Sequence, residues 1–467
     1  MLSIKQKLSN LINFARDKSC DFVYSYYFPM LISAIALLFW LLDLQMIGVS
    51  ILVFITCLVF IFLDDFLPII PLMFIIPMCF RNAKVLLAEE QTLTIVFCSA
   101  LFLSLVIHLF RYSIKITLDG FFYTLLGVLL IFLLGGIFSG DYANHFETID
   151  IFLISAVTPL AIHFFFFNKI KLDENRDYRR YFCFCFICAV ALACLQLCYA
   201  LFYKHFIGKW TLGSLPGGFS WANTNHVANL ILLAVPLCFY MMTSSKGLTA
   251  WFILLAFFYT TIALSHSHGG LATLAFFTPV LMCASYQFSY KSNRKFLIWA
   301  FVILIVSAIL VLTYFYLYDY TALVDFIKTS SSGNGRDKIY EQATNIFANH
   351  PILGIGFGNG KLVLPKNANG FFHSSFFHIL ACAGIVGIAF YIFYYIVRFK
   401  YLTKNNSLIG KFALISFFMF GVYGIIENNE FNIVLTFMTT MITAVGLFNK
   451  KGSDDMPLPL YMKNPKF

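Results

Sequence analysis

The chain has 467 residues, of which 60% are apolar and 12% are charged. About a quarter of the residues of a soluble domain carry a charge, so this composition excludes a soluble protein and indicates one that crosses a membrane many times. The formal net charge of +10 does not indicate a nucleic-acid partner, because most of the excess lies in segments that we expect to face the cytoplasm and the anionic head groups of membrane lipids.

Apolar stretches recur along the whole chain. A helix needs about 20 residues to cross about 30 Å of hydrocarbon, and lipid leaves the backbone no hydrogen-bond partner outside a helix. We therefore predict an all-α, polytopic membrane helical bundle with 12 to 14 transmembrane helices. Fourteen stretches qualify, and the first and third are short enough to lie at the membrane interface. They are residues 28–42, 45–63, 66–80, 91–110, 121–138, 149–167, 181–203, 225–242, 248–264, 270–287, 295–317, 372–397, 408–426 and 431–448.

The basic residues predict the orientation of these helices. With the N terminus inside, 23 of the 32 Lys and Arg residues fall in cytoplasmic segments and nine fall outside, and such an excess marks the cytoplasmic side. Both termini are then cytoplasmic, while the polar loop 318–371 and the shorter segments 217–226 and 265–270 face outward. We divide the chain into an N-terminal transmembrane bundle (1–317, about 11 spans), the outer loop (318–371), C-terminal transmembrane helices (372–448) and a cytoplasmic tail (449–467).

On this map every Lys, Arg, Asp and Glu lies in a loop, in a tail or near the end of a span. Ion-coupled transporters and proton pumps keep ionisable groups near the middle of the membrane, where they are costly and are retained for function. The pattern therefore favours a function other than transport. Cys183, Cys185 and Cys188 lack a nearby fourth ligand and are better explained by packing, so we expect no metal ion and no cofactor.

The outer loop contains a predicted amphipathic helix over residues 336–349. Its apolar residues have helical spacing, and His350-Pro351 ends the run. Arg336, Tyr340 and Ala343 share one stripe of this helix, so the guanidinium points toward whatever the apolar face covers. A guanidinium binds a diphosphate through two parallel hydrogen bonds and stays charged. The alternative is an arginine that reaches the phosphates of ordinary lipids.

A glycine-rich run and a histidine complete the loop. Gly354, Gly356 and Gly358 follow Pro351, but neither spacing that binds nucleotide phosphates occurs among them. We expect Gly356 and Gly358, with Tyr340 of the predicted helix, to contact the substrate. His373 stands at the mouth of the next span. A neutral imidazole accepts a proton from an attacking sugar hydroxyl when it lies within hydrogen-bond reach; the alternative is a structural histidine at the interface.

Two shorter outer segments are also polar. Ser265 to Gly270 forms a tight turn that carries His266 and His268, and the other segment presents Asn223 and Asn225 before His226 at the start of a helix. These side chains either bind phosphate and sugar or simply cap their helices.

In combination these motifs resemble the domain shared by bacterial O-antigen ligases and O-antigen polymerases. The resemblance covers roughly residues 215 to 400. It is carried by Gly335-Arg336-x3-Tyr340-x2-Ala343, Pro351-x2-Gly354-x-Gly356-x-Gly358, His373, Gly384-Ile-Val-Gly387 and the upstream Phe219-x3-Asn223-x-Asn225.

The resemblance implies an integral-membrane glycosyltransferase of the bacterial inner membrane with one large periplasmic loop. Such enzymes transfer a glycan from undecaprenyl diphosphate, with inversion and without a metal ion. Arg336 matches the loop arginine that holds the diphosphate, and His373 matches the histidine proposed to activate the acceptor. The chain departs from the family pattern at two places. The family commonly has an arginine in the serine-glycine turn, where this chain has His266 and His268. It also has an asparagine where this chain has Ser374.

The acceptor is open at this point. A ligase transfers the glycan to a sugar of lipid A-core, whereas a polymerase of O-antigen or capsule repeats uses a second lipid-linked repeat. The ligase is our first interpretation because the outer loop is single and compact. A flippase or exporter of the same lipid-linked sugars would also need outer polar pockets, but the absence of charge near the middle of the predicted spans argues against it.

Overall fold

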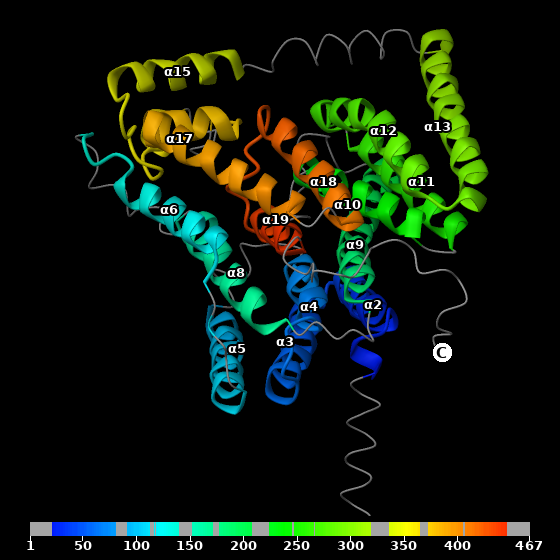
Figure 1. The fold of residues 1–467 in the computed structure, drawn as a ribbon, viewed down its shortest axis with the longest axis horizontal. Coiled ribbons are helices and arrows are strands. Elements are labelled where there is room, and N and C mark those ends of the chain that lie inside the picture. Colours follow the sequence, from blue (N-terminus) through cyan, green and yellow to red (C-terminus); the bar gives the residue numbers. More distant parts are fainter. Residues whose placement is uncertain are drawn as a thin grey trace, which may run out of the picture. The chain divides into compact units, whose positions relative to one another are not determined.

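The computed structural model describes residues 21–80, 91–112, 116, 118–139, 152–170, 177–207, 224–244, 247–265, 267–318, 336–364, 372–404 and 407–445. Every regular element within these ranges is a helix (Figure 1), which confirms the predicted class, and each of the fourteen apolar stretches coincides with a helix. Five of the described helices are long and apolar enough to cross a membrane, so the larger number of crossings stays a prediction.

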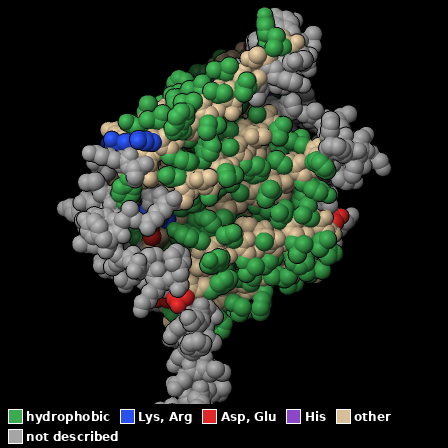
Figure 2. Space-filling view, turned by 90° about the vertical axis from the view of Figure 1, so that its right-hand side faces the viewer, with side chains coloured by type: hydrophobic (Ala, Val, Ile, Leu, Met, Phe, Trp, Pro, Cys, Tyr) green, Lys and Arg blue, Asp and Glu red, His purple; other side chains and the backbone are tan. Residues whose placement is uncertain are grey.

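Large apolar side chains lie on the surface of these helices. Phe102 is 69% exposed, Phe276 is 71% exposed and Trp299 is 66% exposed. Hydrophobic side chains cover much of the face drawn in Figure 2. A soluble protein rarely exposes so much contiguous apolar surface, so the exposed side chains agree with a membrane protein.

Helix packing divides the chain into two units, Met1–Thr117 with Phe165–Asn223 and Leu118–Phe164 with Thr224–Phe467. The boundaries predicted near residues 317, 371 and 448 follow the expected membrane topology and stay a prediction.

The first unit is held by packing of α3 on α2 and α5, and of α9 on α2 and α4. One of its polar contacts is made by a buried lysine, since Lys169 Nζ lies 3.1 Å from Asp64 Oδ1 and donates to the Tyr112 carbonyl. The helices are α2 (Tyr27–Leu41), α3 (Gln45–Phe62), α4 (Ile69–Ile75), η1 (Ile76–Cys79), α5 (Gln91–Arg111) and α9 (Tyr178–Ile207).

The second unit contains every predicted site residue that the structure describes. Its central helix is α10, which is buried nearly all round and packs on α11, α12 and α18. The helices are α6 (Gly120–Leu134), η4 (Leu153–Val157), α8 (Thr158–Lys169, which ends in the first unit), α10 (Thr224–Ser244), α11 (Leu248–Leu264), α12 (His268–Phe288), α13 (Lys291–Tyr318), α15 (Arg336–Asn349), α16 (Gly360–Val363), α17 (Ser375–Thr403), α18 (Leu408–Gly424) and α19 (Ile433–Val445).

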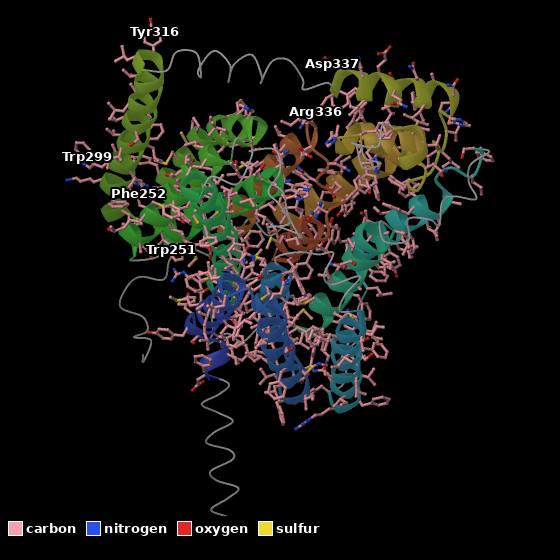
Figure 3. The ribbon with its side chains drawn as sticks, turned by 180° about the vertical axis from the view of Figure 1, so that it is seen from behind. Trp251, Phe252, Trp299, Tyr316, Arg336 and Asp337 are labelled. Carbon is pink, nitrogen blue, oxygen red and sulfur yellow. The ribbon has the colours of Figure 1, made fainter. Side chains whose placement is uncertain are left out.

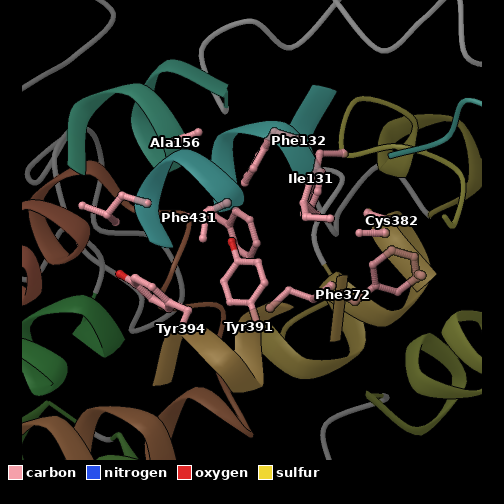
Figure 4. Packing of buried hydrophobic residues seen from close by; sticks show 14 of the residues in the cluster. Ile131, Phe132, Ala156, Phe372, Cys382, Tyr391, Tyr394 and Phe431 are labelled. Carbon is pink, nitrogen blue, oxygen red and sulfur yellow. The ribbon is translucent and has the colours of Figure 1, made fainter. Parts of the chain in front are cut away.

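Helix α15 has the bounds predicted from the sequence and packs on α17 (Figure 1). Ala343 on its predicted apolar stripe is fully buried, in one cluster with side chains of α6 and α17. Aromatic and aliphatic side chains pack together in this cluster (Figure 4). The rings of Phe132 and Phe357 stack with their centroids 3.9 Å apart. The buried stripe therefore fixes which side of α15 faces the bundle.

Helix α17 is broken at Gly384, which has a φ of 61°. A side chain at this position would collide with the Ile352 carbonyl. Residues 351–356, which we call the strap, pair with the break: Ile355 and Gly356 donate to the carbonyls of Ala381 and Cys382, and the amides of Ile385 and Val386 donate to Pro351 and Ile352. The strap thus satisfies the backbone groups that the break leaves free, as a buried helix requires.

Because of this break, both halves of α17 border the segment 425–432, which joins α18 to α19. Ser375 Oγ, at the start of the helix, accepts from the Asn429 amide at 3.1 Å, while Tyr395 donates to Glu430 Oε1 at 2.5 Å from the second half. The expectation of one continuous span over 372–397 did not foresee this bend.

Arg398 lies one residue beyond the predicted span 372–397. It lies within α17, a candidate span that continues to Thr403, and is fully buried. Its Nε donates to Thr443 Oγ1, and its guanidinium lies 4.6 Å from the Tyr394 ring and 4.9 Å from the Phe417 ring. These two rings cover the buried charge.

Candidate functional site

A buried carboxylate lies at the centre of the site. The side chain of Glu427, in the segment 425–432, is 7% exposed. Arg336 Nη2 lies 3.4 Å from Glu427 Oε2, and His373 Nδ1 lies 3.8 Å from Oε1. Asn225 Nδ2 donates to Oε2 at 2.8 Å. Residues from α10, α15 and the segment before α17 thus meet at one acidic side chain.

Arg336 is the first residue of α15 and faces the bundle. Its side chain is 28% exposed, and its Nη1 donates to the carbonyl of Ile426. Figure 3 shows Arg336 on the side of α15 toward the bundle and Asp337 on the other side. The guanidinium is therefore oriented by a carboxylate and by a backbone carbonyl.

His373 has an unusual backbone conformation. Its φ is 49°, in the left-handed region that histidine tolerates better than most residues and that recurs at functional sites. Tyr340 donates to its carbonyl at 3.2 Å, and the Tyr340 ring stacks on Phe377 at 4.4 Å. The next residue, Ser374, accepts from the Phe377 amide and caps α17. The imidazole, 38% exposed, is thus accessible on a fixed backbone.

Ser374 stands where the resemblance implied an asparagine. Both residues cap helix N-termini well, and the Ser374 side chain makes that contact. The departure from the family pattern therefore has a simple local explanation.

The charges around Glu427 favour its ionised form. Burial raises its pKa, but the neighbouring His373, Arg336 and His226 outweigh burial, so the pKa of Glu427 lies below its usual value. At neutral pH the side chain is a carboxylate that only accepts hydrogen bonds. Burial also raises the pKa of Tyr340, with Arg336 opposing the shift, so the tyrosine is a neutral donor.

The serine-glycine turn packs against the end of α18. Ser267 Oγ and the Tyr423 hydroxyl lie 2.7 Å apart. Gly269 lies so close to the side chain of Ile426 that a larger residue would collide with it. His268 opens α12 beside this contact and is half-buried. The turn that carries His268 is therefore next to the residue whose carbonyl binds Arg336.

Part of this region is similar to a known protein family. Residues 250–392 match the family model for O-antigen ligase. The match confirms the resemblance to the O-antigen ligase and polymerase superfamily, and it supports a function of that general type. It includes Arg336, Tyr340 and His373, whereas Asn225 and Glu427 lie outside it. A comparison with curated proteins found no significant match.

Other predicted site residues have different surroundings. Gly356 and Gly358 are buried in and beside the strap, and the amide of Gly356 donates to the Cys382 carbonyl at 2.8 Å. Their contact with substrate stays a prediction, while the positive φ of Gly354 and Gly356 explains why the strap needs glycine. Asn223 and His266 lie outside the described residues.

Glu427 is the site residue that the sequence analysis missed. It lies between the predicted spans 408–426 and 431–448, and the predicted topology puts it on the same outer side as Arg336 and His373. The run Glu427-Asn428-Asn429-Glu430 is a concentration of polar residues in a very short loop. An acidic residue there, opposite an outer arginine, was the signal that could have identified it.

Proposed function

We propose that the chain is a membrane glycosyltransferase that moves a glycan from undecaprenyl diphosphate to a sugar hydroxyl of lipid A-core, at the periplasmic face of the bacterial inner membrane. The observation that carries the proposal is the convergence of Arg336 and His373 on Glu427, at 3.4 Å and 3.8 Å. Arg336, which we propose binds the diphosphate, and His373, which we propose is the general base, therefore lie beside the same carboxylate.

The proposed reaction is a single displacement at the anomeric carbon of the donor. The acceptor oxygen attacks that carbon from the face opposite the diphosphate, so the configuration inverts. His373 takes the proton from the acceptor hydroxyl. The bond from carbon to the diphosphate oxygen breaks, the diphosphate leaves with the electron pair, and Arg336 stabilises the charge that develops on it.

Other residues complete the proposed site. Tyr340 holds the backbone of His373 and is a positioning residue. His268, beside Ile426, takes the place that the family gives to a second arginine and donates a hydrogen bond to the diphosphate. Asn225 donates to Glu427, so we assign it to positioning the carboxylate. When the carboxylate moves away, the Asn225 amide can contact a sugar of the substrate.

The donor reaches this site laterally from the membrane. The large exposed apolar side chains of the helices suit contact with lipid chains, and α15 lies on α17 with its polar side outward. The prenyl chain remains in lipid while the diphosphate approaches the first turn of α15. If the acceptor is a second lipid-linked repeat in place of lipid A-core, the same site acts as a polymerase.

Deletion of the gene and electrophoresis of the lipopolysaccharide test this proposal. Loss of a ligase leaves complete polymer on the carrier lipid and none on lipid A-core. Loss of a polymerase leaves single repeats on the core, and loss of a flippase leaves intermediates in the cytoplasm. Unchanged lipopolysaccharide and unchanged carrier-linked glycan would contradict the proposal.

A further inference from the structure

Arg336 is already occupied in this structure. Its Nη2 lies 3.4 Å from Glu427 Oε2, and its Nη1 donates to the Ile426 carbonyl. Under the proposed function, the same guanidinium must bind a diphosphate. A carboxylate that remains on Arg336 would repel the incoming phosphate oxygens at close range in a partly buried site. Donor binding and the observed ion pair are therefore competing arrangements.

The diphosphate is the stronger ligand of the two. It presents several charged oxygens that match the two parallel donors of a guanidinium. Glu427 meets Arg336 through one oxygen only, at 3.4 Å, which is longer than a good charged hydrogen bond. The donor therefore displaces the carboxylate from Arg336 at the cost of only one long hydrogen bond.

The displaced carboxylate has a hydrogen-bond donor within reach. Glu427 Oε1 is 3.8 Å from His373 Nδ1, and a movement of about 1 Å brings the two atoms to hydrogen-bond distance. Asn225 Nδ2 donates to the other oxygen, Oε2, at 2.8 Å, and this contact is released together with the Arg336 contact as the carboxylate turns.

The remaining titratable groups around Glu427 have other partners. His226 on α10 contacts Asn432, Tyr340 on α15 donates to the His373 carbonyl, and Tyr423 on α18 contacts Ser267. None of these contacts has to break when the carboxylate turns toward His373. The Glu427 carboxylate can therefore turn toward His373 while these three contacts stay in place.

We propose that Glu427 exchanges between Arg336 and His373, so that binding of the donor diphosphate activates the base. In the free enzyme the carboxylate neutralises Arg336. With the donor bound, it accepts a hydrogen bond from His373 Nδ1, which leaves Nε2 free to take the acceptor proton and stabilises the imidazolium that forms. This inference rests on the proposed function and adds a fixed order, in which the donor binds before the acceptor is deprotonated.

Replacement of Glu427 by Gln tests the exchange, because it removes the charge and keeps the size. The purified full chain is titrated with undecaprenyl diphosphate as the probe, and glycan transfer is measured in membranes that supply the cell's own donor. We expect Glu427→Gln to bind the probe about three- to tenfold more tightly, since Arg336 loses a competitor. Transfer falls about 100-fold, since the base is no longer oriented.

The double variant Arg336→Ala/Glu427→Gln shows whether the gain in binding depends on Arg336, as a mutant cycle requires. We expect it to bind no more tightly than Arg336→Ala. Glu427→Asp keeps the charge, so it gains no affinity and loses part of the transfer. This second variant also tests the exchange if the Gln variant fails to fold, because tighter binding by Glu427→Asp would overturn it.

Equal or weaker binding by a folded Glu427→Gln variant, or transfer at the wild-type rate, overturns the exchange while the wild type remains an active transferase. A purely structural role for Glu427 would weaken binding and transfer together. A wild-type protein that neither binds undecaprenyl diphosphate nor transfers glycan removes the proposed function itself, and the exchange with it.

Discussion

Arg336 and Glu427 lie 91 positions apart in the sequence, yet Nη2 of the first is 3.4 Å from Oε2 of the second. The pair joins the first turn of α15 to the segment 425–432 after α18. Together with the Ile426 carbonyl, it fixes the guanidinium at the position where the proposed diphosphate binds. The contact is only partly shielded from solvent, so we assign its importance to orientation rather than to stability.

The ionised form of Glu427 makes stability depend on pH. Its pKa is lower in the folded protein than its usual value, so its contribution is present above the unfolded pKa and is lost as the pH falls through the folded one. We expect the wild type to unfold at a higher temperature than Glu427→Gln at pH 7. The difference should begin to shrink as the pH falls below the usual glutamate pKa of about 4.3 and disappear once the pH is below the lower pKa of the folded state. Thermal unfolding of the two purified proteins across this range measures it, and a difference that does not vary with pH would contradict the assignment.

The proposed role of His373 depends on the basicity of its imidazole. Replacement by Gln keeps the approximate size but removes the base, so we expect glycan transfer to fall by about 100-fold or more with unchanged amounts of protein in the membrane. Assays of transfer in isolated membranes check this. Substantial activity in His373→Gln would show that the imidazole positions substrate and takes no proton.

Tyr340 should affect the same reaction more weakly. Tyr340→Phe removes the hydrogen bond to the His373 carbonyl but keeps the ring that stacks on Phe377. We expect kcat to fall about 2- to 10-fold while KM for the donor stays the same. A large rise in KM with an unchanged kcat would instead assign Tyr340 to substrate binding.

Gly384 tests the break in α17. Its φ of 61° and its close approach to the Ile352 carbonyl leave no room for a methyl group, so Gly384→Ala should lower the stability by about 2 kcal/mol or more. Gly120→Ala is the matched control, because a Cβ at Gly120 would meet no atom within 4 Å. Detergent-solubilised proteins compared by thermal unfolding show the effect. Equal stability of the two variants would mean that the strap does not pair with the break.

The helices were predictable because lipid leaves the backbone few alternatives. Each predicted apolar stretch coincides with a helix, and α15 begins at Arg336 and ends at Asn349 as its periodicity indicated. Arg336 and His373 were identified by residue type and loop position, and the structure brings them to one carboxylate. The residue types and the predicted loop positions therefore indicated the same site.

Three features depend on contacts between distant segments and could not be read locally. The break in α17 requires the strap, whose hydrogen-bond partners lie 26 to 34 positions further along the chain. Glycines inside apolar helices are common, so Gly384 alone does not indicate a break. Arg398 is buried because the rings of Tyr394 and Phe417 cover it. Glu427 owes its role to Arg336, 91 residues away.

Transfer of glycan by the Arg336→Ala variant tests the central claim most directly, namely that this guanidinium stabilises the leaving diphosphate. The measurement is the rate at which carrier-linked glycan appears on lipid A-core in membranes, with Lys338→Ala, on the exposed side of the same helix turn, as the control. We expect Arg336→Ala to lose about 100- to 1,000-fold and Lys338→Ala to match the wild type. A rate near that of the wild type for Arg336→Ala, with normal amounts of protein in the membrane, would contradict the account.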